Sequence, residues 1–147
     1  MIRHLYDQTV SLDGEWELFW ASHEELRKRG ECDKKDVTLS TPRLCTRAAL
    51  EAGGFAHMTT TVPNNFELSL FRAGLCEDPY FGTHTVEMQK YEVMHQFYPC
   101  RFAKPKKING WVLRFAEIDT AAEVFLNGER ILECENMFLC HEADTDG

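Results

Sequence analysis

Alternation of apolar and polar residues predicts that most of this chain forms short β-strands. The clearest case is residues 15–20, where Trp16, Leu18 and Trp20 fall on one face of an extended chain, and Phe19 and two glutamates on the other. Three large side chains on one face predict a sheet that packs against a second layer. Further strands are predicted at residues 2–13, 55–62, 96–102 and 111–116.

A β-hairpin is predicted near the C-terminal end of the sequence. Residues 121–126 and 129–134 both read as strands, and Asn127-Gly128 lies between them. These two residue types tolerate the positive φ that a type I′ turn requires at both central positions. Over the whole chain we expect about eight short strands, a number typical of an antiparallel sandwich.

Helical patterns interrupt the strands in residues 21–54. Ser22 and Glu25 have the spacing of a capping box, and the following residues favour a short helix. A second helix is predicted over residues 43–52. The boundaries expected from local chemistry are Ser22 and Gly30 for the first helix, and Pro42 and Gly53-Gly54 for the second. We interpret this segment as a surface insertion with one or two peripheral helices.

Two further segments carry helical spacing. In residues 66–75, Leu68, Phe71 and Leu75 recur at helical intervals, which predicts a short helix that buries these three side chains. Residues 86–92 fit two alternatives, a helix or a loop that leads into the next strand.

Composition narrows the class of protein. The 147 residues are enough for one domain with a core, and 44% of them are hydrophobic, which argues against disorder. The formal net charge of −8 argues against a nucleic-acid partner, because phosphates require a basic surface. No apolar run reaches the length of a membrane span.

The six cysteines do not have metal-binding or redox spacing. No pair forms a C-x-x-C motif, and the sequence contains no Gly-x-Ser-x-Gly motif, no Gly-rich phosphate loop and no Asp-rich calcium loop. We therefore predict no cofactor and no metal site. Because the sequence begins without an apolar leader, we expect reduced thiols and a cytoplasmic protein.

Several segments, taken in order, resemble one enzyme family. The segments are Leu-Asp-Gly-Glu-Trp-Glu-Leu at 12–18, Val-Pro-Asn-Asn-Phe-Glu-Leu at 62–68, Asp-Pro-Tyr-Phe-Gly at 78–82, the run at 115–128, Glu-Asn-Met-Phe at 135–138 and His-Glu at 141–142. Together they resemble the N-terminal sugar-binding domain of glycoside hydrolase family 2, especially its β-mannosidase-like branch. The resemblance implies a galactose-binding-like jelly-roll β-sandwich over residues 1–147.

The same resemblance implies where catalysis takes place. In that family two glutamates of a later TIM barrel perform the hydrolysis of β-mannosides or β-galactosides, and no such barrel is present here. We therefore expect this chain alone to be inactive. The family domain also continues past a segment like residues 141–147 into a last strand, so we expect a missing strand and an unpaired sheet edge. Such an edge invites pairing into a homodimer.

Glycoside hydrolysis within this chain would require two carboxyl groups at a suitable separation. Asp119 and Glu123 are the best candidates in the sequence. However, Asp119 lies at a connection between strands, where aspartate commonly accepts backbone hydrogen bonds. Glu123 is expected to be solvated or paired with Arg114. Catalysis by this pair is therefore disfavoured.

Five residues are the candidates for contact with a sugar. Asp78, Tyr80 and His84 lie in one predicted loop, and Asn136 and His141 lie in a second segment. Amides, carboxylates and histidines bind hydroxyl groups, and an aromatic ring can lie under a sugar face. The resemblance implies that the first loop reaches the substrate pocket, although His84 stands where relatives often have Asn.

Each candidate also has a plainer interpretation. His84 could be an exposed loop histidine, Asn136 could cap a turn, and His141 could support the Asp78 loop. Met137 and Phe138 are expected to pack, either in the core or against the barrel. Three functions follow: a domain that buttresses a catalytic barrel and shapes its substrate pocket, an independent carbohydrate-binding module, or a purely structural domain. We favour the first.

Overall fold

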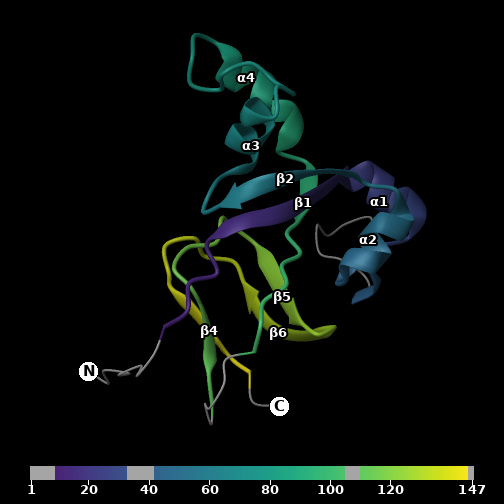
Figure 1. Cartoon of the computed structure of the whole chain (residues 1–147). Coiled ribbons are helices and arrows are strands. Elements are labelled where there is room, and N and C mark those ends of the chain that lie inside the picture. Colours follow the sequence, from purple (N-terminus) through teal and green to yellow (C-terminus); the bar gives the residue numbers. More distant parts are fainter. Residues whose placement is uncertain (1–8, 33–41, 105–109, 146–147) are drawn as a thin grey trace. The chain divides into compact units, whose positions relative to one another are not determined.

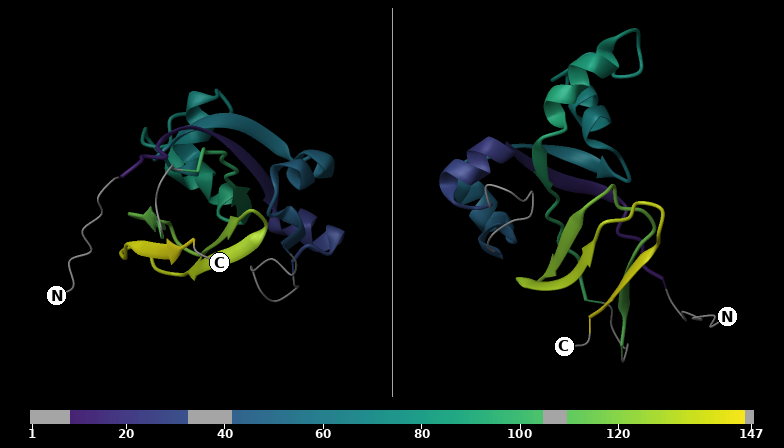
Figure 2. Two further views of the ribbon diagram at one scale, coloured as in Figure 1. Left: turned by 60° about the horizontal axis from the view of Figure 1, so that its bottom comes forward. Right: turned by 180° about the vertical axis from the view of Figure 1, so that it is seen from behind.

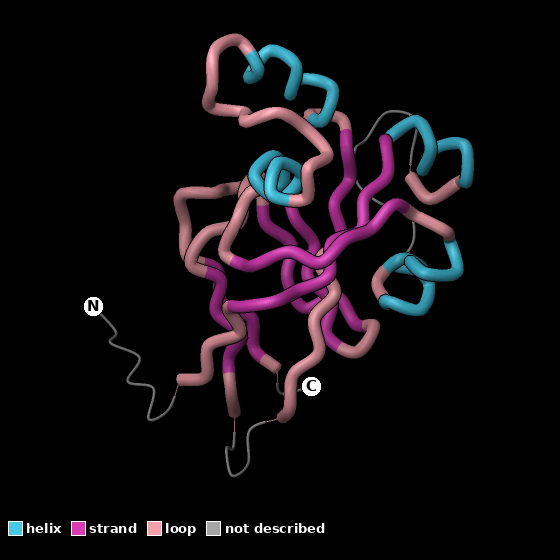
Figure 3. Tube along the Cα trace, turned by 45° about the horizontal axis from the view of Figure 1, so that its top comes forward, coloured by secondary structure: helices cyan, strands magenta, loops and turns pink. Residues whose placement is uncertain are grey.

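The computed structural model describes residues 9–32, 42–104 and 110–145, and the described residues form seven β-strands and four α-helices (Figure 1). The strands pair antiparallel throughout, and the helices, cyan in Figure 3, are all short. The predicted fold class, mainly antiparallel β with a few short helices, is confirmed. The chain divides into two compact units, residues 1–22 with 56–102 and residues 23–55 with 103–147, which are described in turn.

The first unit is built on a three-stranded sheet with β1 at its centre. β1 (Gly14–Ser22) pairs with β2 (Ala56–Val62) on one side and with β3 (Met94–Phe97) on the other. The β1–β2 register runs from Gly14 opposite Val62 to Trp20 opposite Ala56. β1 buries Leu18 on one face and Phe19, which stacks on His57, on the other. β1 is therefore buried on both faces and paired along both edges.

Helix α3 (Phe66–Arg72) packs on one face of this sheet. Asn65 caps it, because its side-chain oxygen accepts a hydrogen bond of 2.8 Å from the Leu68 amide. The core of the unit combines Leu18 with Phe66 and Leu70 from α3. Partly buried apolar side chains surround these three: Trp20, Met58, Cys76, Tyr91, Met94 and Tyr98. The second layer predicted for β1 is therefore supplied here by a helix.

The helix itself was predicted correctly, but the face that it buries was not. Leu68 is only half-buried, and Phe71 and Leu75 are exposed. The buried residues are instead Phe66, Ser69 and Leu70, which also have helical spacing. Ser69 belongs to this face because its hydroxyl hydrogen-bonds the buried Thr60 of β2 at 2.7 Å. The hydrophobic pattern did not reveal this face because one of its three buried residues is a serine.

The structure decides between the two alternatives for residues 86–92. They lie in helix α4 (His84–Met88) and the 3₁₀ turn η2 (Gln89–Tyr91), not in a loop. The strand predicted at 96–102 begins earlier and ends at Phe97, as β3. At the start of the chain, residues 9–13 form no strand, and residues 2–8 of that prediction lie outside the described residues.

The second unit begins with the predicted insertion. It contains α1 (His23–Arg29), the 3₁₀ turn η1 (Pro42–Leu44) and α2 (Arg47–Gly53), and α1 and α2 lie side by side (Figure 2). Arg29 links them: it donates to the Gly53 carbonyl oxygen at 2.5 Å, and its guanidinium lies 4.5 Å from the centroid of the Phe55 ring.

Local chemistry determines where these helices end, but the start of α2 was placed too early. α1 ends at Gly30, with φ of 73°, and α2 ends at Gly54, with φ of 65°. The predicted start at Pro42 is instead the separate turn η1. α2 begins after Thr46, whose hydroxyl accepts from the Ala49 amide at 3.3 Å.

The predicted hairpin is confirmed. β5 (Ala122–Leu126) and β6 (Glu129–Cys134) pair antiparallel around Asn127 and Gly128, whose φ values are 51° and 91°. A register shift between Val124 and Phe125 marks a bulge.

A strand that the sequence did not predict completes the second unit. β7 (His141–Asp144) pairs antiparallel with β4 (Val112–Phe115), so that His141 lies opposite Phe115. Next to this pair, the Thr145 amide and hydroxyl both donate to the Trp111 carbonyl oxygen, at 3.2 and 2.7 Å. Residues 141–144, after which a last strand was expected to be missing, therefore form a paired strand themselves.

Candidate functional site

The first group of candidate residues lies in a loop that hydrogen bonds hold in one conformation. We call residues 78–85 the loop; they comprise the end of the connection from α3 and the first two residues of α4. The Asp78 carboxylate accepts from the Tyr80 amide at 2.9 Å, and its carbonyl oxygen accepts from His84 Nδ1 at 3.0 Å. The Thr85 hydroxyl donates to the carbonyl oxygen of the buried Pro79 at 2.8 Å. Asp78 thus acts as the internal support of the loop.

Tyr80 is an exposed aromatic residue with a restrained ring. Its side chain is 73% exposed, yet its hydroxyl accepts a hydrogen bond from Asn65 Nδ2 at 3.3 Å. Because Asn65 also caps α3, the ring is tied to the first turn of that helix. The ring therefore offers an apolar face to solvent at little entropic cost.

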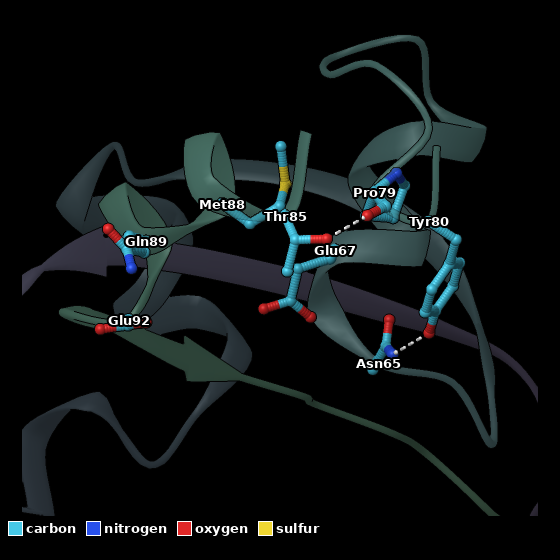
Figure 4. A pocket seen from close by; sticks show the side chains of 8 residues that line it. All are labelled: Asn65, Glu67, Pro79, Tyr80, Thr85, Met88, Gln89 and Glu92. Carbon is cyan, nitrogen blue, oxygen red and sulfur yellow. Dashed lines mark hydrogen bonds between the residues drawn. The ribbon is translucent and has the colours of Figure 1, made fainter. Parts of the chain in front are cut away.

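A cavity of about 260 Å³ lies between α3, this loop and the α4–η2 segment. We call it the α3–α4 cavity. Its lining residues are Asn65, Glu67, Pro79, Tyr80, Thr85, Met88, Gln89 and Glu92. In Figure 4, Tyr80 and Asn65 lie at one end of the cavity, Gln89 and Glu92 at the other, and Glu67 between them.

Some polar side chains that line the cavity are hydrogen-bonded within the first unit, and others are not. Asn65 and Thr85 are engaged in the hydrogen bonds given above. The side chains of Glu67, Gln89 and Glu92 make no hydrogen bond or ion pair with any described residue. Buried Met88 adds apolar surface. Hydroxyl-directed polar groups beside an aromatic ring are the elements of a carbohydrate site.

Of the candidate residues in the first loop, only Tyr80 lines the cavity. His84 is half-buried rather than bare, since it donates to the Asp78 carbonyl and lies 6.1 Å, centroid to centroid, from the Phe81 ring. The other lining residues were missed in the sequence. A signal was present: Thr85, Met88, Gln89 and Glu92 have the i, i+3, i+4, i+7 spacing of one helical face. This spacing was not used to predict a site because residues 86–92 were equally compatible with a loop.

The second group of candidates lies in the other unit. The Asn136 side chain accepts from the Phe138 amide at 2.9 Å, which caps a turn, and the Asn136 carbonyl accepts from His141 Nε2 at 2.8 Å. Asn136 and His141 are thus brought together by their own segment, not by a ligand. Phe138 is 86% exposed, so of its two predicted locations the core is wrong, and packing against a barrel stays a prediction.

The carboxylates considered for catalysis have structural partners. Glu123 was expected to be solvated or paired with Arg114; it pairs instead with Arg130 at 2.6 Å, and this hydrogen bond raises the pKa of Arg130. Arg114 instead donates to Cys140 Sγ at 3.0 Å. Asp119 accepts a hydrogen bond from the hydroxyl of its neighbour Thr120. Both carboxylates are therefore engaged in local contacts within the second unit.

None of the six cysteines, all of which are described, forms a disulfide. Burial raises the pKa of the Cys76 and Cys100 thiols, so these two favour the unreactive protonated form. Within the described part of the chain, no helix is both long enough and apolar enough to span a membrane.

Comparison with known proteins identifies a family. The family described as "Glycosyl hydrolase 2 galactose-binding domain-like" matches residues 28–147. Beta-mannosidase B of Thermothelomyces thermophilus is 38% identical over 85 residues, which are 56% of this chain and 10% of that protein. Beta-mannosidase B of Aspergillus terreus is 35% identical over 86 residues, 57% of this chain and 10% of that protein. The match spans about a tenth of the length of these relatives, and no solved structure matches the chain.

Proposed function

We propose, from the premise that this chain belongs to the glycosyl hydrolase 2 galactose-binding domain-like family, that it is a non-catalytic domain of a glycoside hydrolase. Its relatives named Beta-mannosidase B favour a β-mannoside as the substrate of the whole enzyme. In this proposal residues 1–147 form an N-terminal sugar-binding domain that supports a catalytic barrel and shapes one wall of its substrate pocket. The family match carries this conclusion.

The arrangement of acidic residues supports a non-catalytic role. Glu123, the better of the two candidates, is held by Arg130, which also lies 3.2 Å from Glu133. Its charge is therefore compensated within the hairpin, whereas a catalytic pair needs one carboxyl group that can donate a proton and one that can attack or activate water.

Exposed apolar side chains support a role beside another domain. In the first unit Tyr80, Phe81 and Val86 are each more than 60% exposed, and they lie within a short stretch around α4. In the second unit Phe138 and Leu139 are exposed next to each other. Apolar clusters of this kind on a protein surface are typical of docking sites.

The candidate sugar-contacting residues keep that role as a proposal. Tyr80 is the best placed, because its ring is exposed and restrained. Asp78, His84, Asn136 and His141 act mainly by holding the backbone of their segments, and we assign them the positioning of these loops. Pairing of two copies through a sheet edge stays a prediction, and light scattering over a range of concentrations tests it.

The experiment compares hydrolysis with and without a catalytic domain. We expect the purified 147-residue chain to release no nitrophenol from a nitrophenyl β-mannoside. We expect activity when the chain replaces the matching segment of the Thermothelomyces enzyme. In that chimera Tyr80→Ala should raise KM, whereas Glu87→Gln, an exposed change on α4, should leave it unchanged. Turnover by the chain alone that disappears in Glu123→Gln would overturn the proposal.

A further inference from the structure

We propose that the α3–α4 cavity is a saccharide-binding site that holds one neutral pyranose ring, and that it does so within this domain, without a catalytic partner. The ligand class rests on the proposed function. The site itself rests on the geometry of the first unit.

The size of the cavity limits the ligand to a single sugar ring. Its volume of about 260 Å³ lies just below the range of roughly 300–1,000 Å³ typical of small-molecule sites. A drug-sized ligand or an extended oligosaccharide would therefore project from it, which makes a single pyranose ring the better match to this volume.

The open polar groups match the hydrogen-bonding needs of a sugar. The carboxylates of Glu67 and Glu92 accept from hydroxyl groups, and the Gln89 amide both donates and accepts. None of the three has a partner among the described residues, so binding would break no internal hydrogen bond. These three groups therefore supply the polar contacts of the proposed site.

The charge of the lining selects against acidic ligands. Among the described residues, two carboxylates line the cavity and no basic side chain does. The nearest lysine in sequence, Lys90, directs its ammonium group over the Tyr91 ring, 4.9 Å from the centroid. A uronate or a sugar phosphate would face two like charges, whereas a neutral sugar carries no charge for them to repel.

The Tyr80 ring is prepared for stacking. Its backbone amide donates to Asp78 at 2.9 Å and its hydroxyl accepts from Asn65 at 3.3 Å, and both contacts are made within the first unit itself. Ordering a surface side chain normally costs free energy when a ligand binds. Here the fold has already met that cost, which is unusual for a residue that is 73% exposed.

The test is a titration of the isotope-labelled 147-residue chain with methyl β-D-mannoside, followed by amide NMR shifts. A ligand of this size in an open cavity should bind with a dissociation constant on the order of a few millimolar. We expect saturable shifts at residues that line the cavity, and none with glucuronate. The proposal would be overturned if no saturable shift appeared at ligand concentrations tenfold above this constant.

Paired variants assign the shifts to the cavity. Gln89→Ala and Tyr80→Ala should each weaken binding about tenfold, the loss expected for one good polar or stacking contact. Phe81→Ala, next to Tyr80 and equally exposed, and Glu87→Gln, on α4 outside the cavity, should have no effect. Gln89 is exposed, so its variant is expected to fold even if the Tyr80 variant does not.

The remaining outcomes are equally decisive. Equal binding by Gln89→Ala and the parent chain would place the sugar elsewhere and overturn the proposal. So would shifts caused by Ca²⁺ and abolished by Glu92→Gln, because they would make the cavity a cation site. The titration uses no catalytic domain, so the absence of binding would not contradict the proposed function. Likewise, an inactive chimera would not affect the interpretation of the titration.

Discussion

Replacing Leu70 by alanine tests the packing of the first unit, because Leu70 is 2% exposed and lies at the centre of its core. Leu70→Ala removes three carbon groups, each worth about 0.8 kcal/mol on transfer from water, or about 2.4 kcal/mol in all. If half of the vacated volume remains as a cavity of roughly 40 Å³, about 1 kcal/mol is added. The expected loss in the free energy of unfolding is therefore about 3.4 kcal/mol.

The same substitution at Leu75 is the matched control. Leu75 is 54% exposed and lies just beyond the end of α3, and the sequence pattern had placed it in the core instead. Leu75→Ala should cost less than about 1 kcal/mol, since little of its surface leaves water on folding.

Urea unfolding followed by circular dichroism measures both variants. The Leu70→Ala midpoint should fall with little change in slope, and its melting temperature should fall by about 10 °C, taking roughly 3 °C per kcal/mol for a chain of this size. Equal losses for the two variants, or a larger loss for Leu75→Ala, would refute the burial that we describe for α3.

Four further predictions follow from single contacts. Ser69→Ala should lower stability by about 2 kcal/mol, because its hydroxyl donates to the Asn65 carbonyl and accepts from Asn64 and Thr60; an unchanged urea midpoint would contradict this. Because φ is 51° at Asn127, Asn127→Gly should be neutral or slightly stabilising, whereas Asn127→Ala should be destabilising by about 1 kcal/mol. Thermal melting measures both variants. Thr46→Ala should cost about 1 kcal/mol through loss of the α2 cap, whereas Thr46→Ser should restore it. Burial raises the pKa of Tyr98 to about 12, above its ordinary value of 10. One tyrosine should therefore ionise late in an ultraviolet titration. The contribution of Tyr98 to the free energy of unfolding should be intact below pH 10 and lost as the pH rises toward 12.

Local chemistry was enough to predict the parts of the fold that depend on neighbouring residues. Asn127-Gly128 specified the hairpin turn because few residues tolerate positive φ at two successive positions. Glycines at 30 and 54 ended their helices for the same reason. The alternation in β1 predicted the strand itself, although β1 is buried on both faces, and ordered motifs along the chain were enough to identify the family.

Only the tertiary structure decided which residues meet. Two faces of α3 had helical spacing, and the hydrogen bond between Ser69 and Thr60 of a different strand selected the one that is buried. β7 has few residues and weak alternation, so that its pairing with β4, more than twenty residues earlier, could not be read locally. The α3–α4 cavity likewise depends on residues from three separate segments, the start of α3, the loop with Tyr80, and the α4–η2 segment. Turns and helix ends are governed by the backbone of adjacent residues, whereas buried faces, strand partners and cavities depend on contacts between distant segments, which a local pattern does not encode.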